Sequence, residues 1–149
     1  MLDNEVVPLG GRGARNMAPE WDTAPSPEPI FVLIVEDEPI IRFLAAEALR
    51  ELGVSVIEAA SADEAWAYLQ AGTMVDLVFT DHRMPGLMTG AQLVTRIHES
   101  YPAIETIIAS GFYDASERPT EVILKPYNII EVANNLVERV KKKKQGSAT

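Results

Sequence analysis

The strongest constraint on the fold is a regular alternation of short apolar runs with helix-like segments from residue 30 onward. Phe31–Val35 is a continuous run of apolar and β-branched residues, which is typical of a strand buried on both faces of a parallel sheet. Four further runs follow at residues 54–59, 77–80, 106–109 and 122–124. This order predicts an α/β fold, a doubly wound five-stranded parallel sheet whose right-handed crossovers place helices on both faces.

The segments between these runs carry signals for helices. Pro39 suits the first turn of one helix, and Ser61-Ala62-Asp63-Glu64 has the pattern of a capping box at the start of another. Two more helices are expected, from about residue 90 to 100 and from Asn128 to about Val140. The segment between residues 110 and 125 is short and contains glycine and proline, so the helix there is expected to be short or mobile.

Two tails flank this pattern. Residues 1–29 contain half of the ten prolines, and such a segment cannot propagate a helix, so we expect a disordered tail. Residues 141–149 begin with four lysines and are expected to form a basic disordered tail. The remaining residues, 30–140, have the usual size of one domain.

Composition excludes several classes of protein. A formal net charge of −9 and a pI near 4.7 argue against a nucleic-acid partner. The absence of cysteine excludes disulfides, thiolate zinc sites and cysteine nucleophiles. The N-terminus has no signal-peptide pattern and the apolar runs are too short to span a bilayer, so we expect a cytoplasmic protein without a membrane partner.

Side chains capable of chemistry follow four of the predicted strands. Glu36 and Asp37 come after the first strand, Asp81 after the third, Ser110 after the fourth and Lys125 after the fifth. In a doubly wound sheet, ligands bind outside the carboxyl ends of the strands. Three ionised carboxylates would repel one another there, and Mg²⁺, a hard cation with oxygen ligands, relieves that repulsion.

Such a set of residues suits phosphoryl chemistry. Asp81 can attack phosphorus as a nucleophile, while the metal and Lys125 neutralise the transferred phosphoryl oxygens. Ser110 can donate a hydrogen bond to one of those oxygens. Taken singly, Asp81 could merely cap a turn and Lys125 could be a surface charge. Their occurrence at successive strand ends is what favours a common site.

Four motifs carry these side chains: Val35-Glu36-Asp37-Glu38-Pro39, Asp81-His82-Arg83-Met84-Pro85-Gly86, Ala109-Ser110-Gly111 and Lys125-Pro126-Tyr127. In this order, each at a strand end, they resemble the receiver domain of two-component response regulators. The resemblance covers about residues 30–140 and implies the flavodoxin-like receiver fold. It implies phosphorelay signalling, in which a histidine kinase or phosphotransfer protein donates a phosphoryl group to the domain.

The resemblance also implies a role for each matching residue. Glu36 and Asp37 look like the acidic metal pair, Asp81 like the phosphoacceptor and third metal-binding carboxylate, and the carbonyl of Arg83 like a further Mg²⁺ ligand. The switch hydroxyl corresponds to Ser110 and the phosphate-sensing lysine to Lys125. The peptide bond before Pro126 is expected to be cis.

The chain departs from the common pattern at the position of the aromatic switch residue, where it has Val122. Ile108-Ala109-Ser110-Gly111-Phe112-Tyr113 instead resembles the Phe-Ala-Thr-Gly-x-Tyr subgroup of single-domain response regulators, with Ile and Ser in place of Phe and Thr. That resemblance makes Tyr113 the candidate aromatic switch. Packing at the surface is the plainer interpretation of this tyrosine.

We expect a single-domain response regulator that is not an enzyme beyond its own phosphorylation and dephosphorylation. Its output would be contact with an unknown downstream protein, and the strong negative charge favours a monomer in the unphosphorylated form. A flavodoxin-like cofactor binder is disfavoured because Glu36-Asp37-Glu38 would repel its phosphate. A hydrolytic phosphatase is disfavoured because Arg83 stands where a second acid is needed. A degenerate receiver that binds proteins without phosphorylation is the remaining alternative.

Overall fold

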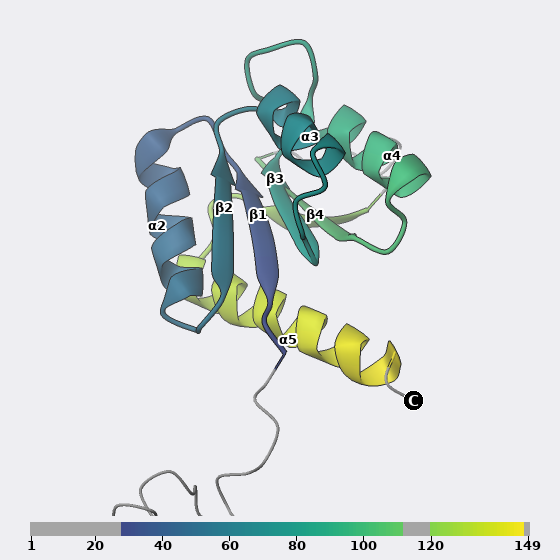
Figure 1. Ribbon diagram of the computed structural model, residues 1–149. Helices are drawn as coiled ribbons and strands as arrows, with labels where there is room; N and C mark the ends of the chain where they lie inside the picture. The colour runs from purple at the N-terminus through teal and green to yellow at the C-terminus, as the bar shows by residue number, and fades with distance from the viewer. Residues whose placement is uncertain (1–27, 112–119, 148–149) are drawn as a thin grey trace, which may run out of the picture.

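The computed structural model describes residues 28–111 and 120–147, and its strands form one parallel sheet (Figure 1). The strand order is β2-β1-β3-β4-β5, which confirms the predicted five-stranded sheet. The strands are β1 (Phe31–Val35), β2 (Ser55–Ala59), β3 (Leu77–Asp81), β4 (Glu105–Ser110) and β5 (Glu121–Leu124). From β1 the chain goes to β2 at one edge of the sheet. It then crosses to β3, on the other side of β1, and continues through β4 to β5 at the opposite edge. The strand order therefore reverses between β1 and β3, where such folds bind their ligands.

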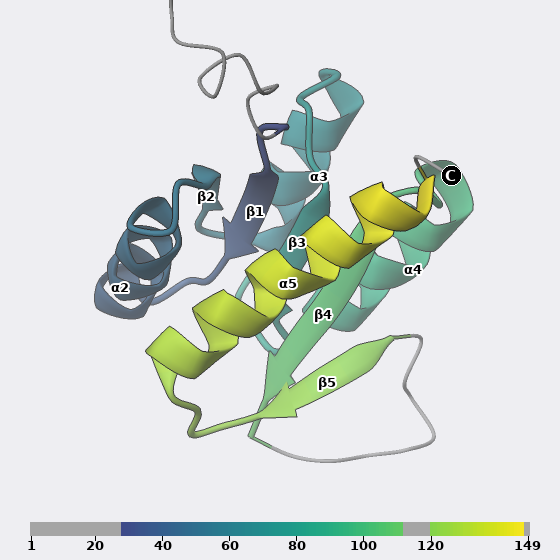
Figure 2. The same ribbon diagram turned by 90° about the horizontal axis from the view of Figure 1, so that it is seen from below.

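Helices cover both faces of the sheet, as the doubly wound pattern predicts (Figures 1 and 2). They are α2 (Pro39–Arg50), α3 (Ala62–Gln70), α4 (Gly90–Ser100) and α5 (Ile129–Ser147). One face packs against α2 and α5, and the other against α3 and α4. The short or mobile helix expected between β4 and β5 falls on residues 112–119, outside the described residues. No helix in the described ranges is long and apolar enough to cross a membrane.

The core consists of two apolar layers, one on each side of the sheet. In β1, Val32 and Ile34 face α2 and α5, whereas Leu33 and Val35 face α3 and α4. This follows from strand geometry, since successive side chains point to opposite faces. Burial on both faces explains why the run of apolar residues in β1 is continuous.

Side chains satisfy the backbone N–H groups at the starts of three helices. The Ser61 hydroxyl accepts a hydrogen bond from the Glu64 N–H (3.0 Å), as the predicted capping box requires. The Asn128 side chain accepts one from the N–H of the third residue of α5 (3.0 Å). A reciprocal capping box at Thr89 and Gln92 starts α4, and the sequence analysis did not anticipate it.

The C-terminal helix is longer than predicted. Helix α5 continues to Ser147 rather than ending near Val140, so the prediction of a disordered tail is wrong for residues 141–147. The basic end of this helix lies against acidic residues at the edge of the sheet where the strands begin. Lys144 Nζ is 3.2 Å from Asp76 Oδ1 and 3.3 Å from Glu28 Oε2. These pairs, together with the favourable interaction of cations with a helix C-terminus, stabilise the additional turns.

Candidate functional site

Three carboxylates converge where β1 and β3 end. Glu36 follows β1, and its N–H donates a hydrogen bond to the Ala59 carbonyl at the end of β2 (3.0 Å). Asp81 is the last residue of β3. One carboxylate oxygen each from Glu36, Asp37 and Asp81 can be chosen so that all three lie within 4.8 Å of one another. The predicted acidic cluster is thus present in the fold.

A single ammonium group approaches this cluster from the loop after β5. Lys125 Nζ lies 2.8 Å from Asp81 Oδ1 and 3.9 Å from Glu36 Oε1. The Lys125 N–H donates to the Ser110 carbonyl (2.8 Å), and the Lys125–Pro126 bond is cis, as the resemblance implied. Burial lowers the pKa of Lys125, but the hydrogen bond and charge of Asp81, with the charge of Glu36, outweigh it, so the pKa is raised.

Glu36 is a buried carboxylate whose pKa is raised. Glu36 is only 5% exposed, and this burial is the main reason that the pKa of its carboxyl group rises from 4.5 to about 7. The Glu38 N–H, 3.1 Å from Glu36 Oε2, lowers this pKa, the charge of Asp81 raises it, and Lys125 lowers it. Among the described residues, Lys125 is the one cation that pairs with carboxylates of this cluster, so the cluster is short of positive charge. An all-oxygen donor set of this kind fits a hard divalent ion such as Mg²⁺.

The candidate switch hydroxyl lies beside a histidine. Ser110 is the last residue of β4 and is buried, and its Oγ is 3.5 Å from His82 Nδ1. The His82 backbone N–H donates to both Asp81 Oδ1 and the Ala109 carbonyl, with an N···O distance of 3.0 Å in each case. The sequence analysis did not select His82 as a site residue. Its position one residue after the acceptor, at the end of a strand next to β4, is the signal that could have identified it.

Arg83 and Tyr113 are the two remaining predicted site residues. Arg83 lies in the loop after Asp81 with an exposed side chain, and only its carbonyl was expected to bind metal. Tyr113, the candidate aromatic switch, lies outside the described residues.

The end of strand β3 is packed closely against the start of α4. The Gly90 N–H donates to the His82 carbonyl (2.9 Å). A Cβ atom at Gly90 would lie 2.0 Å from the Asp81 carbonyl oxygen, which no real contact allows. Glycine is therefore required where the helix begins beside the acceptor. The sequence analysis placed Gly90 at a helix start but did not recognise this constraint.

The chain is similar in sequence and in structure to known proteins. The chain is 33% identical over 119 residues to the sensor kinase CckA of Brucella abortus, covering 74% of this chain and 12% of the kinase. It is 32% identical to the transcriptional regulatory protein AruR of Pseudomonas aeruginosa, covering 74% of this chain and 50% of AruR. The chain thus spans half or less of the length of these curated relatives.

A solved structure agrees with these sequence matches. The response regulator TrrA of Thermotoga maritima, solved in complex with Mg²⁺-BeF, superposes with a TM-score of 0.66 at 28% identity, covering 74% of this chain and 98% of TrrA. The family model of the response regulator receiver domain matches residues 32–135, which include the whole acidic cluster and all five strands except Phe31 at the start of β1. The chain belongs to the response regulator receiver domain family of two-component signalling.

Proposed function

We propose that this chain is a phosphorelay receiver that accepts a phosphoryl group on Asp81 from a sensor histidine kinase or phosphotransfer protein, in a reaction that requires Mg²⁺. The main support for the proposal is that Asp81 lies between a positive charge, Lys125, and two other carboxylates. Its carboxylate lies 2.8 Å from the Lys125 ammonium and belongs to the cluster formed with Glu36 and Asp37. This is an arrangement suited to positioning and charge neutralisation in phosphoryl transfer.

In the proposed reaction, an Asp81 carboxylate oxygen attacks the phosphorus of a phosphohistidine. The new O–P bond forms as the N–P bond breaks, and the leaving imidazole nitrogen takes up a proton. Lys125, which pairs with Asp81 beforehand, stays close enough to pair with a phosphoryl oxygen afterwards. Bound Mg²⁺, held by Glu36, Asp37, Asp81 and the Arg83 carbonyl, would supply the positive charge that the cluster lacks. The complex of the similar regulator TrrA with Mg²⁺-BeF supports this assignment.

The response to phosphorylation is proposed to begin at Ser110. Its hydroxyl can rotate toward a phosphoryl group on Asp81, exchanging its present contact with His82 for a hydrogen bond to a phosphoryl oxygen. We assign the output to contact with a downstream protein rather than to catalysis on another substrate. The intact acidic cluster and the Lys125–Asp81 pair disfavour a receiver that works without phosphorylation.

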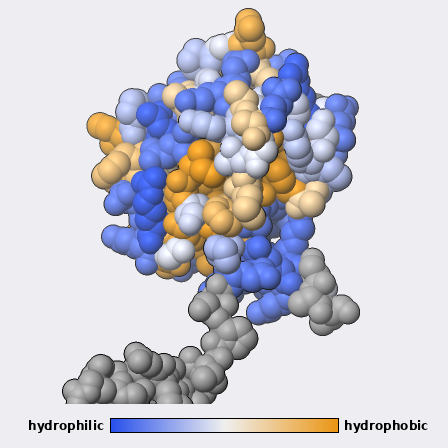
Figure 3. Space-filling model, in the orientation of Figure 1, coloured by the Kyte–Doolittle hydropathy of each residue, from blue (hydrophilic) through white to orange (hydrophobic). Residues whose placement is uncertain are grey.

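An exposed apolar surface beside the site supports a protein as the phosphoryl donor. On α2, the side of the helix facing solvent carries Ile40, Phe43 and Leu44, which are 75%, 55% and 51% exposed. Figure 3 shows apolar atoms over the outer side of this helix. A hollow of about 610 Å³ connects this surface to Lys125, with Tyr127 in its wall. A donor that packs on this surface would place its histidine at the same edge of the sheet as Asp81.

The acceptor is tested by intact mass spectrometry after incubation with acetyl phosphate and Mg²⁺. One phosphoryl group is expected on the wild type, none on Asp81→Asn, and none when EDTA removes the metal. The matched control is Asp76→Asn, which makes the same change at the opposite end of β3 and should be labelled like the wild type. Undiminished labelling of Asp81→Asn, or efficient labelling in EDTA, would contradict the proposal.

The donor is tested by phosphotransfer profiling against a panel of purified histidine kinases. For the kinase that transfers fastest, Phe43→Ser should slow transfer because it removes an exposed apolar contact. Labelling by acetyl phosphate should be unchanged, since the small donor needs no docking surface. Equal slowing with both donors would mean that the variant damages the site rather than the docking of a kinase.

A further inference from the structure

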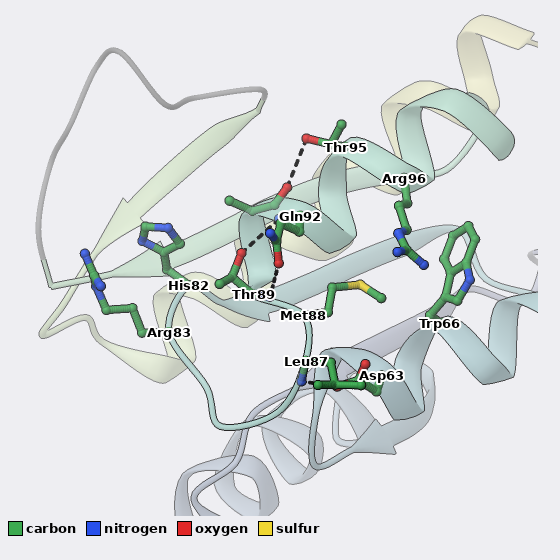
Figure 4. Close-up of a pocket in the computed structure, with 11 residues that line it drawn as sticks. Asp63, Trp66, His82, Arg83, Leu87, Met88, Thr89, Gln92, Thr95 and Arg96 are labelled. Carbon is green, nitrogen blue, oxygen red and sulfur yellow. Dashed lines mark hydrogen bonds between the residues drawn. The ribbon is translucent and has the colours of Figure 1, made fainter.

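A second hollow, of about 870 Å³, lies between α3, α4 and the loop that leads from β3 to α4 (Figure 4). Its walls come from all three segments. Trp66 belongs to α3, Leu87 and Met88 to the loop, and Gln92 and Arg96 to α4. The groove contains no residue of the apolar surface of α2 and no carboxylate of the acidic cluster, although His82 and Arg83, which also line it, directly follow Asp81 in the chain.

An exposed arginine lies toward each end of the groove. Figure 4 shows Arg83 at one end and Arg96 at the other, beside Trp66. Within residues 28–111 and 120–147, the other arginines, Arg42, Arg50 and Arg139, all pair with carboxylates, whereas Arg83 and Arg96 form no ion pair. In a chain with a net charge of −9, two unpaired guanidinium groups beside one groove indicate an anionic ligand.

The remaining polar groups of the groove already bond within the protein. Thr89 and Gln92 cap α4 reciprocally, and the Asp63 carboxylate accepts a hydrogen bond from the Leu87 N–H (3.1 Å). The Thr95 hydroxyl donates to a carbonyl of its own helix (3.1 Å). A small-molecule site offers several convergent donors and acceptors that orient the ligand. This groove offers instead two separated guanidinium groups, an apolar surface between them and one carboxylate, Asp63, which already accepts the Leu87 N–H.

The apolar surface is unusually open. Leu87 is 96% exposed, the neighbouring Met88 is buried, and the Arg96 guanidinium carbon lies 5.7 Å from the centre of the Trp66 ring. A guanidinium held against an aromatic ring keeps its donors available for a carboxylate. The groove therefore combines apolar contact with carboxylate recognition at both ends.

We propose that this groove binds an acidic peptide segment of a partner protein. Carboxylates of the segment would pair with Arg83 and Arg96, and an apolar side chain between them would pack on Leu87 and Trp66. The interaction goes beyond phosphoryl transfer, because it uses neither Asp81 nor a metal.

The test uses the full chain without Mg²⁺ or phosphoryl donor, so its failure would not bear on phosphorylation of Asp81. The probe is a fluorescein-labelled hexapeptide with two glutamates on each side of Leu-Phe, and its binding is followed by anisotropy. We expect a Kd between about 10 µM and 1 mM that weakens as salt is added. The same peptide with glutamines in place of the glutamates should bind at least about fivefold more weakly.

Variants locate the site. Arg96→Gln should weaken binding about three- to tenfold, and Thr95→Glu should do the same by adding a negative charge to the groove. Lys142→Gln, which removes the same charge from an exposed residue of α5, should bind like the wild type. Chemical shift changes of the Trp66 indole N–H, measured with Trp21→Phe so that it is the only tryptophan, should follow the binding curve.

Several results would overturn the proposal. One is absence of peptide binding at about 1 mM, and another is equal binding of the glutamate and glutamine peptides. A third is equal affinity of Arg96→Gln and Lys142→Gln. Another is displacement of the peptide by ATP or citrate at concentrations far below the Kd of the peptide. That result would identify a small-anion site instead.

Discussion

Replacing Glu36 with glutamine is expected to make the metal-free protein more stable at high pH, although it removes a residue of the site. Burial holds the pKa of Glu36 at about 7, against 4.5 for an ordinary glutamate. Above pH 7 the folded protein must keep this carboxylate ionised in a buried position, whereas the unfolded chain ionises it freely. Glutamine carries no charge at any pH and avoids this cost, while its amide oxygen can still accept the Glu38 N–H.

The size of the effect follows from the two pKa values. Below pH 4.5 Glu36 is protonated in both states and costs nothing. Between 4.5 and about 7 the folded state binds more protons than the unfolded state, so the free energy of unfolding falls as the pH rises. The cost reaches about 3 kcal/mol well above pH 7, and about 2.5 kcal/mol of it arises between pH 5 and pH 8.

The assay is urea denaturation in EDTA at pH 5 and at pH 8. The free energy of unfolding of Glu36→Gln minus that of the wild type should increase by about 2.5 kcal/mol between these pH values. Taking the difference cancels the titrating groups that do not interact with Glu36, and the attraction of Lys125 at 3.9 Å is already included in the pKa of about 7. Glu38→Gln is the control, because its side chain is exposed beside the same site, and its difference should stay nearly constant.

The reasoning would be refuted if the free energy of unfolding of Glu36→Gln minus that of the wild type were the same at pH 5 and at pH 8. That result would mean that the folded protein relaxes around the ionised carboxylate, or that water reaches it. Added Mg²⁺ provides a second check at pH 8, where it should stabilise the wild type more than the variant by offsetting the carboxylate repulsion.

Three further predictions concern the framework around the site. Gly90→Ala should lower the free energy of unfolding by about 1–3 kcal/mol because of the clash with the Asp81 carbonyl; Gly111→Ala, where a Cβ meets nothing within 4 Å, is the control for the same urea assay. Lys144→Ala should cost less than about 1 kcal/mol, and the loss should vanish in concentrated salt, so a thermal shift that is unchanged by salt would contradict it. Ser61→Ala should cost about 1 kcal/mol, and an unaltered urea midpoint would show that its hydrogen bond to Glu64 contributes nothing.

The sheet and the acidic cluster could be predicted because both depend on local pattern. A continuous apolar run such as Phe31–Val35 marks a central parallel strand, and chemistry-bearing residues directly after such runs must meet at one edge. Glu36, Asp37, Asp81 and Lys125 were identified on that basis, and the structure brings them together.

The features that were missed depend on contacts between remote segments. The lysines at the end of α5 looked like a solvated tail, because their partners Glu28, Asp76 and Glu105 are far away in the sequence. The burial of Glu36, with its raised pKa, also required the packed structure. The contact between His82 and Ser110 depends on the register of β3 against β4, which aligns Asp81 with Ala109.

The ion pair between Lys144 and Glu28 joins the two end segments of the described chain on the side of the domain where the strands begin (Figure 1). Lys144 also contacts Asp76, which precedes β3, whereas Asp81 ends that strand. Both ends therefore lie at the pole of the domain opposite Asp81. A circular permutant that joins them through a short flexible linker needs to bridge little space. Opening the chain beside Met74, which is 68% exposed in the connection between α3 and β3, would put the new ends at that same pole and leave the acceptor edge uncovered.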